Sequence, residues 1–514
     1  MLYKYVPTQE EYTLVYLNPL TGVENSSAVK ISNDGSFTAD ITVYSPTLIV
    51  LTDKKILNIP IWVAPNQESR MWVNLPEIYR SGSKLLRNKQ SNGKQVYYSG
   101  YLSELSADLS RDDISKPAKE DHSSKIIDMN QKQYIDFTLA KYNETIEYNN
   151  NLKISPLAKK IANYEQVLRL TSILNNVDYT VANAYSKKHN VSIREALKVI
   201  MLEKNEDDND FYKLMPFDDP DILLVSYISQ YIQILGYSQP NSSDPYATIR
   251  HLAENNEVLP EERELIKQYI LSMENNQIIE NHSEMIEVLN KYRSLSEKYM
   301  NNQRGANYLA KFWDKDQAFL LDLIKTQKIC KSIQEYNPIS DSEKPEILKL
   351  HPVLSELIYE QNEEILARIE ENKNKSGFEI IDPPANVDEE LFSELIKPFK
   401  GKVILVDLWG TWCAPCRMAH VEMDPMKASF EGKDVVFLYI AGENSPKNTW
   451  ENMISGIQGS HYRLKETQWN FLNDMLKVSG VPTYIILDKE GKQTFYHTGF
   501  PGVDIIKREL NKLL

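Results

Sequence analysis

The sequence predicts a multidomain protein with an N-terminal antiparallel β-sandwich, a central all-α region and a C-terminal α/β domain. Three observations lead to this fold class. Apolar and polar residues alternate between about residues 10 and 80, apolar residues recur at helical spacing up to about residue 370, and apolar runs then alternate with helical segments. A chain of 514 residues has room for two to four such domains.

The N-terminal domain, predicted at residues 1–95, consists of short strands. Asp34-Gly35 separates two alternating runs and is typical of a tight hairpin turn. Five or six strands with short turns indicate a small antiparallel sandwich, and no catalytic constellation occurs among them. The expected strands are 12–17, 28–32, 36–43, 47–51, 56–63 and 70–74.

Residues 96–370 are predicted to form a helical domain. No chemical motif interrupts its helical patterns, so we expect a scaffold or a partner-binding surface. Cys330 lies in one of these patterns and is expected to be a small buried side chain, with a redox role as the alternative. The helical patterns cover residues 134–142, 157–174, 222–235, 285–299, 308–333 and 347–369.

Residues 377–514 are predicted to form an α/β domain. Alternating strands and helices are typical of βαβ units with a parallel sheet core. The stretch 443–476 is expected to hold helical segments. The expected strands are 378–381, 403–409, 434–441, 484–488 and 493–497, and the other expected helices are 391–399, 414–430 and 503–514.

The pair Cys413 and Cys416 is the strongest chemical signal in the chain. It follows the apolar run 403–408, which Gly410 ends, and it opens the helix expected to start at 414. Unpaired N–H groups and the helix dipole favour a thiolate at Cys413, which can attack a disulfide. Cys416, one turn later, can close a ring with Cys413 and release the mixed disulfide.

Two further positions accompany the pair. Asp407 is the one acid in the apolar strand, and burial favours the neutral form of a carboxyl group. We expect it to take or give the Cys416 proton, directly or through water, with a merely capping or pairing carboxylate as the alternative. Val481-Pro482 precedes the strand 484–488, which predicts a turn and a candidate cis peptide bond.

These residues resemble a known family. Trp412-Cys-Ala-Pro-Cys416, Asp407 and Val481-Pro482-Thr483 are similar to motifs of the thioredoxin superfamily. The segment Leu408-Trp-Gly-Thr-Trp-Cys-Ala-Pro-Cys-Arg417 resembles the active-site sequence of the TlpA/ResA-like thiol–disulfide oxidoreductases of the bacterial envelope. The resemblance covers 377–514 and implies an enzyme that reduces protein or small-molecule disulfides, with a membrane thiol donor as its electron source.

The resemblance also implies roles for individual residues. Cys413 and Cys416 would be catalytic, with Asp407 as the acid or base. Pro482 would face the sulfur atoms, the Val481 backbone would pair with an extended substrate, and Trp412 would be part of the docking surface. The chain departs from the family pattern after the second cysteine. The family often has an acid and a proline where this chain has Ala419 and Val421, whereas its own acid and proline follow later, at Glu422 and Pro425.

The composition limits which partners the protein can have and in which compartment it is expected. The net charge of −14 disfavours nucleic acid and anionic membranes, and no apolar run approaches the ~20 residues of a membrane span. Residues 1–7 lack the apolar core of a secretory signal, so we expect either a cytoplasmic protein or a mature chain; the resemblance favours the periplasm or cell envelope. Three cysteines exclude a disulfide scaffold, and nothing predicts a cofactor.

Other functions are alternatives for this pair and this chain. A zinc site needs four ligands, and the remaining candidates, Cys330, His420, His461 and His497, lack ligand spacing. The pair could instead be a purely structural disulfide, which its reactive placement disfavours. A peroxidase would use a lone cysteine in a different frame. A third alternative is a binding or assembly protein in which residues 1–376 dominate and the redox domain is accessory.

Overall fold

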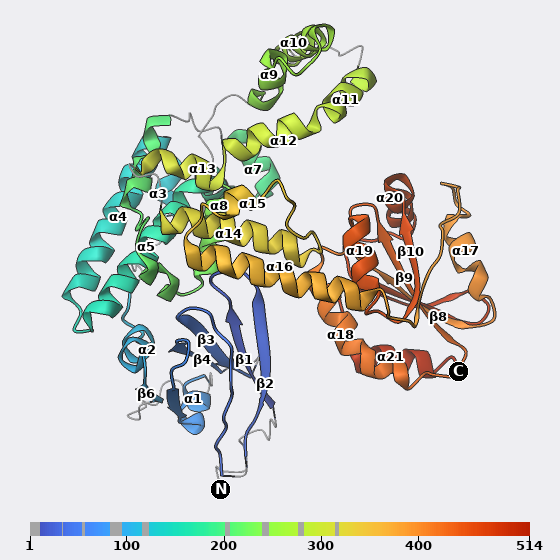
Figure 1. Ribbon diagram of the computed structural model, residues 1–514, viewed down its shortest axis with the longest axis horizontal. Helices are drawn as coiled ribbons and strands as arrows, with labels where there is room; N and C mark the ends of the chain where they lie inside the picture. The colour runs from blue at the N-terminus through green and yellow to red at the C-terminus, as the bar shows by residue number, and fades with distance from the viewer. Residues whose placement is uncertain are drawn as a thin grey trace. The chain divides into compact units, whose positions relative to one another are not determined.

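The computed structural model describes residues 11–32, 34–53, 57–82, 95–115, 123–200, 206–238, 246–275, 282–313 and 318–514 (Figure 1). The chain divides into two compact units. The first comprises Met1–Lys331 and Leu350–Ser355, and the second comprises Ser332–Lys349 and Glu356–Leu514. Each unit is described by itself below. No helix in the described ranges has the length and apolar character needed to cross a membrane.

The first unit begins with an antiparallel sheet, as the alternating pattern predicted. The four strands are hydrogen-bonded in the order β2-β1-β3-β4, and a separate ribbon pairs β5 with β6. One face of the sheet packs on a core that includes Leu14, Ile49 and Ile59. The finer prediction of a two-layer sandwich stays a prediction. The strands are β1 (Glu11–Leu17), β2 (Glu24–Lys30), β3 (Thr47–Thr52), β4 (Asn58–Val63), β5 (Ser69–Val73) and β6 (Val96–Gly100).

The strand expected at 36–43 is wrong, because these residues form no strand. A turn forms at Asp34-Gly35, where the Ser32 N–H donates to the Ser36 carbonyl at 2.8 Å, but the chain beyond it does not return along β2. Instead β2 pairs along its whole length with β1. The connecting turn places Gly22 at a φ of 73°, a conformation that glycine adopts without steric strain.

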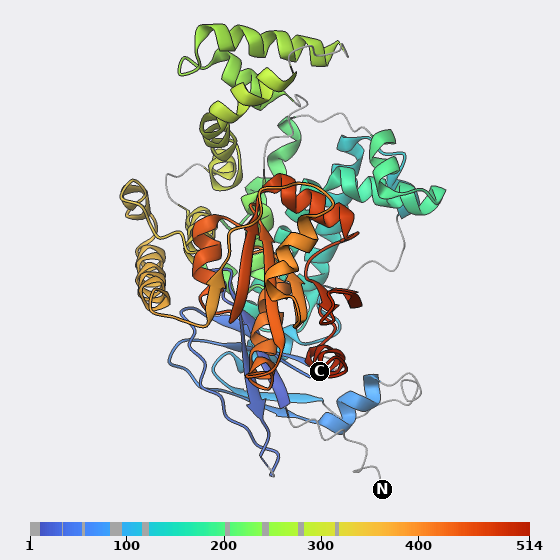
Figure 2. The same ribbon diagram turned by 90° about the vertical axis from the view of Figure 1, so that its right-hand side faces the viewer.

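Every regular element described between Ser103 and Gln334 is a helix. The helices expected at 222–235, 285–299 and 308–333 are each divided into shorter ones. Helices α9 to α12 pack on a core of their own that includes Leu252, Ile266 and Met285 (Figure 2). The elements are α1 (Leu75–Gly82), α2 (Ser103–Leu109), α3 (Ser123–Ile126), α4 (Gln131–Asn151), α5 (Pro156–Asn175), α6 (Val177–His189), α7 (Ile193–Val199), η2 (Glu206–Leu214), η3 (Pro220–Leu224), α8 (Ile228–Gly236), α9 (Ala247–Glu254), α10 (Pro260–Glu274), α11 (His282–Lys291), α12 (Arg293–Asn302), α13 (Gly305–Leu309), η4 (Ala310–Phe312) and α14 (Phe319–Gln334).

The second unit is built on a six-stranded mixed sheet with the order β12-β11-β8-β9-β10-β7. Strands β8, β9, β10 and β7 are parallel, whereas β11 and β12 are antiparallel to their neighbours. The segment 443–476 holds helices, as expected, and also contains the strand β10, which was not expected. The elements are α15 (Lys344–Ile347), α16 (Pro352–Asn372), β7 (Phe378–Ile380), α17 (Leu391–Ile396), η5 (Lys397–Phe399), β8 (Val403–Leu408), α18 (Ala414–Ala428), β9 (Val435–Gly442), α19 (Lys447–Ile454), β10 (Gly459–Leu464), α20 (Glu466–Met475), β11 (Thr483–Leu487), β12 (Gln493–Thr498) and α21 (Val503–Asn511).

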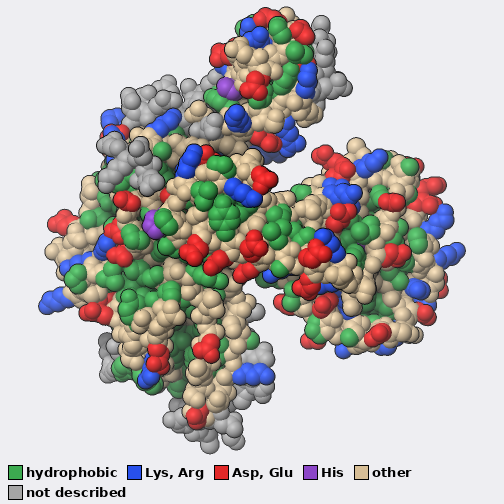
Figure 3. All heavy atoms as spheres, in the orientation of Figure 1, with side chains coloured by type: hydrophobic (Ala, Val, Ile, Leu, Met, Phe, Trp, Pro, Cys, Tyr) green, Lys and Arg blue, Asp and Glu red, His purple; other side chains and the backbone are tan. Residues whose placement is uncertain are grey.

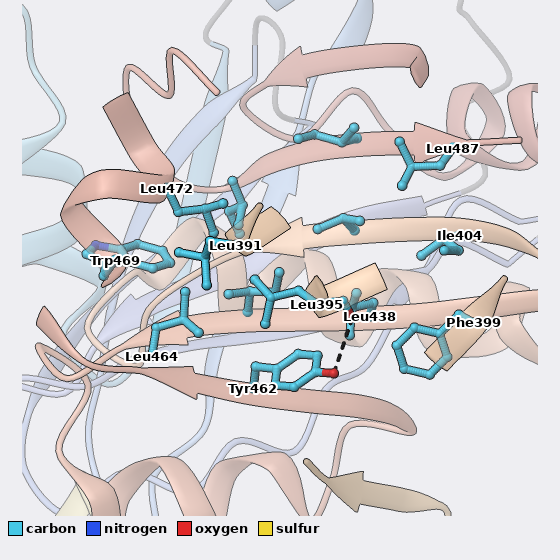
Figure 4. Close-up of a cluster of buried hydrophobic side chains, with 14 residues drawn as sticks. Leu391, Leu395, Phe399, Ile404, Leu438, Tyr462, Leu464, Trp469, Leu472 and Leu487 are labelled. Carbon is cyan, nitrogen blue, oxygen red and sulfur yellow. Dashed lines mark hydrogen bonds between the residues drawn. The ribbon is translucent and has the colours of Figure 1, made fainter. Parts of the chain in front are cut away.

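Helices cover both faces of this sheet, so β8 is buried along its whole length. Helices α17 and α20 pack over one face, where Leu391 and Leu472 contact the even-numbered residues of β8 (Figure 4). The Tyr462 hydroxyl donates to the Leu395 carbonyl at 3.2 Å in this layer. Helices α18 and α21 cover the opposite face, where they pack on the odd-numbered residues of β8. Because side chains alternate along a strand, Asp407 lies on the α18 face.

Candidate active site

The two cysteines of the Cys-Ala-Pro-Cys motif are joined by a disulfide bond in this structure. Their Cα atoms are 5.3 Å apart, within the ordinary range for a disulfide. Cys413 and Cys416 lie at the carboxyl end of β8, where α18 begins. The structure therefore describes the oxidised form of the pair, and reduction would leave two thiols one helical turn apart.

Cys413 is the N-cap residue of α18. Its backbone is non-helical, and its Sγ accepts a hydrogen bond from the Cys416 N–H at 3.2 Å. Pro415 lies in the first turn of α18. Backbone N–H groups in the first turn have no acceptor within the helix, so the missing N–H of proline costs no hydrogen bond there. The Cys413 sulfur thus lies at the N-terminus of α18, a position where unpaired N–H groups and the positive end of a helix dipole generally favour a thiolate.

Exposure differs along the motif. Cys416 is fully buried, Cys413 keeps 4% of its surface exposed, and Trp412 beside it is 56% exposed. Cys413 is therefore the more accessible of the two cysteines, and the exposed Trp412 precedes it in the chain.

The loop that carries the motif is fixed on both sides. The Thr411 N–H donates to Ser445 Oγ at 3.1 Å, and the Cys413 N–H donates to the Gly410 carbonyl at 3.0 Å. A side chain at Gly410 would place its Cβ 2.8 Å from the Trp412 ring. Glycine at this position therefore lets the Trp412 indole lie against the backbone.

The Val481-Pro482 turn lies beside the cysteine pair. Its peptide bond is cis. Val481 packs against the buried cluster that contains both cysteines. Pro482 leads directly into β11, whose first residue, Thr483, is opposite Leu408 at the end of β8. This register brings the turn, predicted from the sequence, next to the motif.

Asp407 is 1% exposed and contacts a residue that the sequence analysis considered only as a zinc ligand. The Nε2 of His420, on α18, lies 3.1 Å from Asp407 Oδ2 and donates to it. His420 is itself buried, and its ring packs edge-on against Trp409 and Tyr439. The sequence spacing could have indicated His420 as a site residue, because it follows Cys416 by four residues and so lies on the same helix face.

Two tyrosines flank Asp407 on the neighbouring strands. Tyr439 of β9 and Tyr484 of β11 are its cross-strand neighbours. Burial raises the pKa of both hydroxyl groups well above the usual value, and the nearby Asp407 carboxylate raises them further. Both tyrosines are therefore neutral at physiological pH and surround the carboxyl group with uncharged rings.

Other sequence candidates lie elsewhere. Cys330 is fully buried on α14, in the first unit, and burial raises its pKa to about 12, so it remains a neutral thiol. Ala419 packs in the α18 core, Val421 is exposed, and Pro425 lies inside α18. No group of three or more His, Cys, Asp or Glu residues with the arrangement of a metal site occurs in the described part of the chain.

Comparison with known proteins identifies the fold of this region. Residues 401–493 match the profile of a family described as thioredoxin-like. The thiol:disulfide interchange protein HelX of Rhodobacter capsulatus is 25% identical over 114 residues, which cover 22% of this chain and 62% of HelX. The thiol-disulfide oxidoreductase ResA of Bacillus thuringiensis is 28% identical over 101 residues, covering 19% and 55%. The thiol:disulfide interchange protein DsbE of Yersinia pestis is 30% identical over 100 residues, covering 19% and 50%.

The chain thus spans between half and two thirds of the length of these curated relatives. Among solved structures, the thioredoxin domain of a thiol-disulfide oxidoreductase from Bacteroides vulgatus is 19% identical with a TM-score of 0.21, covering 23% of this chain and 84% of that one. A second thiol-disulfide oxidoreductase from the same organism is 27% identical with a TM-score of 0.20, covering 23% and 77%.

Proposed function

We propose that this chain, whose C-terminal region belongs to the thioredoxin-like family, is a thiol–disulfide oxidoreductase that reduces protein disulfides through Cys413 and Cys416. The observation that carries the proposal is the Cys413–Cys416 disulfide at the N-terminus of α18. Such a pair alternates between a dithiol and a disulfide, and the helix terminus favours the reactive thiolate.

The reaction starts from the dithiol form. The Cys413 thiolate attacks one sulfur of the substrate disulfide, so that a Cys413–substrate bond forms and the other substrate sulfur leaves as a thiolate. Cys416 then gives its proton to Asp407 and attacks Cys413 Sγ, and the first substrate sulfur leaves. Both thiolates take protons from their surroundings. Two electrons have passed to the substrate, and the protein returns to the disulfide form described above.

The residues around the pair support a docking surface for an extended polypeptide. Trp412 presents an exposed indole beside Cys413, and Val481 lies against the same cluster. We assign Trp412 to apolar contact with the substrate, and the backbone of Val481 and Pro482 to pairing with it, as in β-strand addition. Small-molecule disulfides would use Cys413 without these contacts.

The finer organisation is also a proposal. We divide the chain into a β-sandwich-like domain at 1–95, a helical domain at 96–370 and the redox domain at 377–514. The resemblance of Leu408–Arg417 to envelope oxidoreductases supports a periplasmic or cell-envelope location and a membrane thiol donor. Acidic and basic side chains are interspersed on the surface of the C-terminal unit in Figure 3, which with the net charge of −14 fits a protein substrate better than nucleic acid.

Turnover tests the proposal. The purified full chain, supplied with dithiothreitol, should reduce insulin disulfides faster than dithiothreitol alone. Cys413→Ala should reduce this activity to background, because it removes the attacking sulfur. Cys330→Ala is the matched control and should keep the activity, since Cys330 is buried on α14. Absence of turnover in the wild type, or full turnover in Cys413→Ala, would refute the proposal.

The direction of electron flow needs a separate measurement. The reduction potential of the Cys413–Cys416 couple can be determined by equilibration with glutathione. A value near thioredoxin's, about −270 mV, would support the reductive direction, whereas a value near about −120 mV would make the protein an oxidant.

A further inference from the structure

Asp407 of β8 and His420 of α18 form a hydrogen-bonded pair on the face of the sheet that α18 covers. Val403 and Leu405, on the same face of β8, pack against Ala419 and other residues of α18. Trp409, two residues beyond Asp407, packs in one cluster with both cysteines. Asp407 therefore lies between these two groups of contacts, and His420 reaches it from one helical turn after Cys416.

The two oxygens of Asp407 have different environments. Oδ2 accepts the hydrogen bond from His420, whereas Oδ1 is buried and makes no hydrogen bond of normal geometry with a described residue, although the Tyr484 hydroxyl of β11 interacts with the carboxyl group. Buried acceptors without a partner are rare in proteins, because desolvation is not compensated. A carboxylate that is fixed by one oxygen and open at the other is suited to take a proton at the open oxygen.

We propose that His420 is a positioning residue for disulfide exchange, which holds Asp407 by Oδ2 so that Oδ1 receives the proton of Cys416. This inference rests on the proposed function. In the second step the S–H bond of Cys416 breaks and its proton passes to Asp407. The Cys416 sulfur forms the bond to Cys413, and the substrate sulfur leaves with the electron pair of the broken mixed disulfide. The substrate is the only oxidant required.

The other titratable groups that face Asp407 and His420 are poor acceptors for the Cys416 proton. Tyr439 and Tyr484 are neutral, as described above. His461 of β10 stacks on Tyr439 at a ring distance of 4.9 Å, and burial lowers its pKa to about 4, so its imidazole is a weak proton acceptor near pH 7. Burial also lowers the pKa of Lys427, although this residue keeps an ion pair with Asp424 at 3.2 Å.

The remaining charged neighbours lie on α18 itself. Lys427 Nζ lies 5.1 Å from the centre of the Tyr439 ring, and its charge interacts with Asp407. Glu422 is exposed and acts on the site only through its charge near Tyr484. Lys427 interacts with Asp407 through its charge and therefore does not replace His420 as the hydrogen-bond donor.

A two-step release assay separates the roles of the residues. The reduced full chain, in a Cys330→Ala background, is mixed with one equivalent of dithiobis-nitrobenzoate, whose released thiolate is coloured. The first release reports attack by Cys413, and the second reports attack by Cys416 on the mixed disulfide. Both rates are followed by stopped flow over a range of pH.

We expect His420→Leu to slow the second release by about tenfold or more at neutral pH and to leave the first nearly unchanged, since positioned general bases contribute ~10²–10⁴-fold. The difference should close at alkaline pH, where Cys416 ionises without help. His420→Gln keeps an N–H donor toward Asp407 and should restore most of the rate. Asp407→Asn should slow the second release by about 10²-fold, and adding His420→Leu should slow it no further.

Met423→Ala is the control for a loss of stability, because Met423 is buried on the same helix among apolar residues. It should lower the melting temperature and leave the pH profile of the second release unchanged. If His420→Leu does not fold, His420→Asn, whose shorter amide falls short of Asp407, gives the same contrast with His420→Gln.

The outcomes distinguish the two proposals. An unchanged second release in the His420 variants, or additive effects of Asp407→Asn and His420→Leu, would overturn the role of His420. If the wild type shows no second release at any pH, the proposed function itself is wrong. A first release that is normal, followed by a second that depends on His420 only through Asp407, supports both.

Discussion

Helices α14 and α18 each bury a cysteine completely, yet the surroundings of the two sulfur atoms differ. Cys330 lies in the interior of α14, where nearby polar side chains serve packing: Gln327 Nε2 donates to the Pro19 carbonyl at 2.7 Å, and Thr326 Oγ1 donates to the Asp322 carbonyl at 2.8 Å. Cys416 lies in the first turn of α18, bonded to the N-cap residue Cys413. Burial alone therefore does not predict which cysteine is reactive; the position within the helix does.

The surroundings of Cys330 and Cys416 also differ in how many buried polar atoms lack a hydrogen-bond partner. Several side chains around the cysteine pair carry a buried nitrogen or oxygen that has no hydrogen-bond partner in the described part of the structure, and Gln327 Oε1 is such an atom near Cys330. Buried polar groups are normally paired, so a concentration of exceptions marks a region shaped by something other than packing. These side chains are Asp407, Trp409, Tyr439, Trp450, His461 and Tyr484.

The largest expected difference concerns thiol reactivity. In the reduced protein at neutral pH, we expect iodoacetamide to modify Cys413 at least ~10³-fold faster than Cys330, because only the thiolate reacts and the pKa of Cys330 is raised to about 12. Peptide mass spectrometry after timed quenching measures both rates. Equal rates in the folded protein would remove the distinction between the two helices, whereas Cys330 should react normally once the chain is unfolded.

The second prediction concerns the stability of the buried pair. His420→Leu leaves the Asp407 carboxylate without its donor and should lower the free energy of unfolding by about 3–5 kcal/mol at neutral pH. Replacing both residues by leucine should cost less than the single change, because no unpaired charge remains. Chemical denaturation of the three proteins gives the values. A double variant less stable than His420→Leu would show that the pair stabilises the fold and is not retained for chemistry.

The third prediction concerns acid sensitivity. Burial lowers the pKa of His461 from 6.5 to about 4, so the unfolded chain binds a proton there before the folded chain does. Stability should therefore fall by roughly 3 kcal/mol as pH decreases from about 6.5 to about 4. His461→Phe should remove this contribution, and His497→Phe, at an exposed position, should keep it. Denaturation midpoints measured across this pH window test the prediction. If the midpoint of His461→Phe depends on pH as strongly as that of the wild type, His461 is not the source of the acid sensitivity.

The success of the sequence predictions followed the local character of each signal. Strand β8 and the start of α18 were predicted closely, because an apolar run, a glycine and a Cys-x-x-Cys motif act within about fifteen residues. Strand β10 was missed inside a segment that was expected to be helical. Its pairing with β9 and β7, which are distant in sequence, overrides the local pattern. The strand expected at 36–43 did not form, and β2 remains an edge strand of the sheet that pairs with β1.

The sequence by itself contained the local signals of the candidate site: two cysteines at a helix start, an acid in the strand before them and a proline turn ahead of a later strand. These signals are local, because propensity and spacing act over one or two turns of chain. Only the tertiary structure decided which groups meet that acid. His420, Tyr439 and Tyr484 come from three different elements, and strand register and helix packing alone bring them to one carboxyl group.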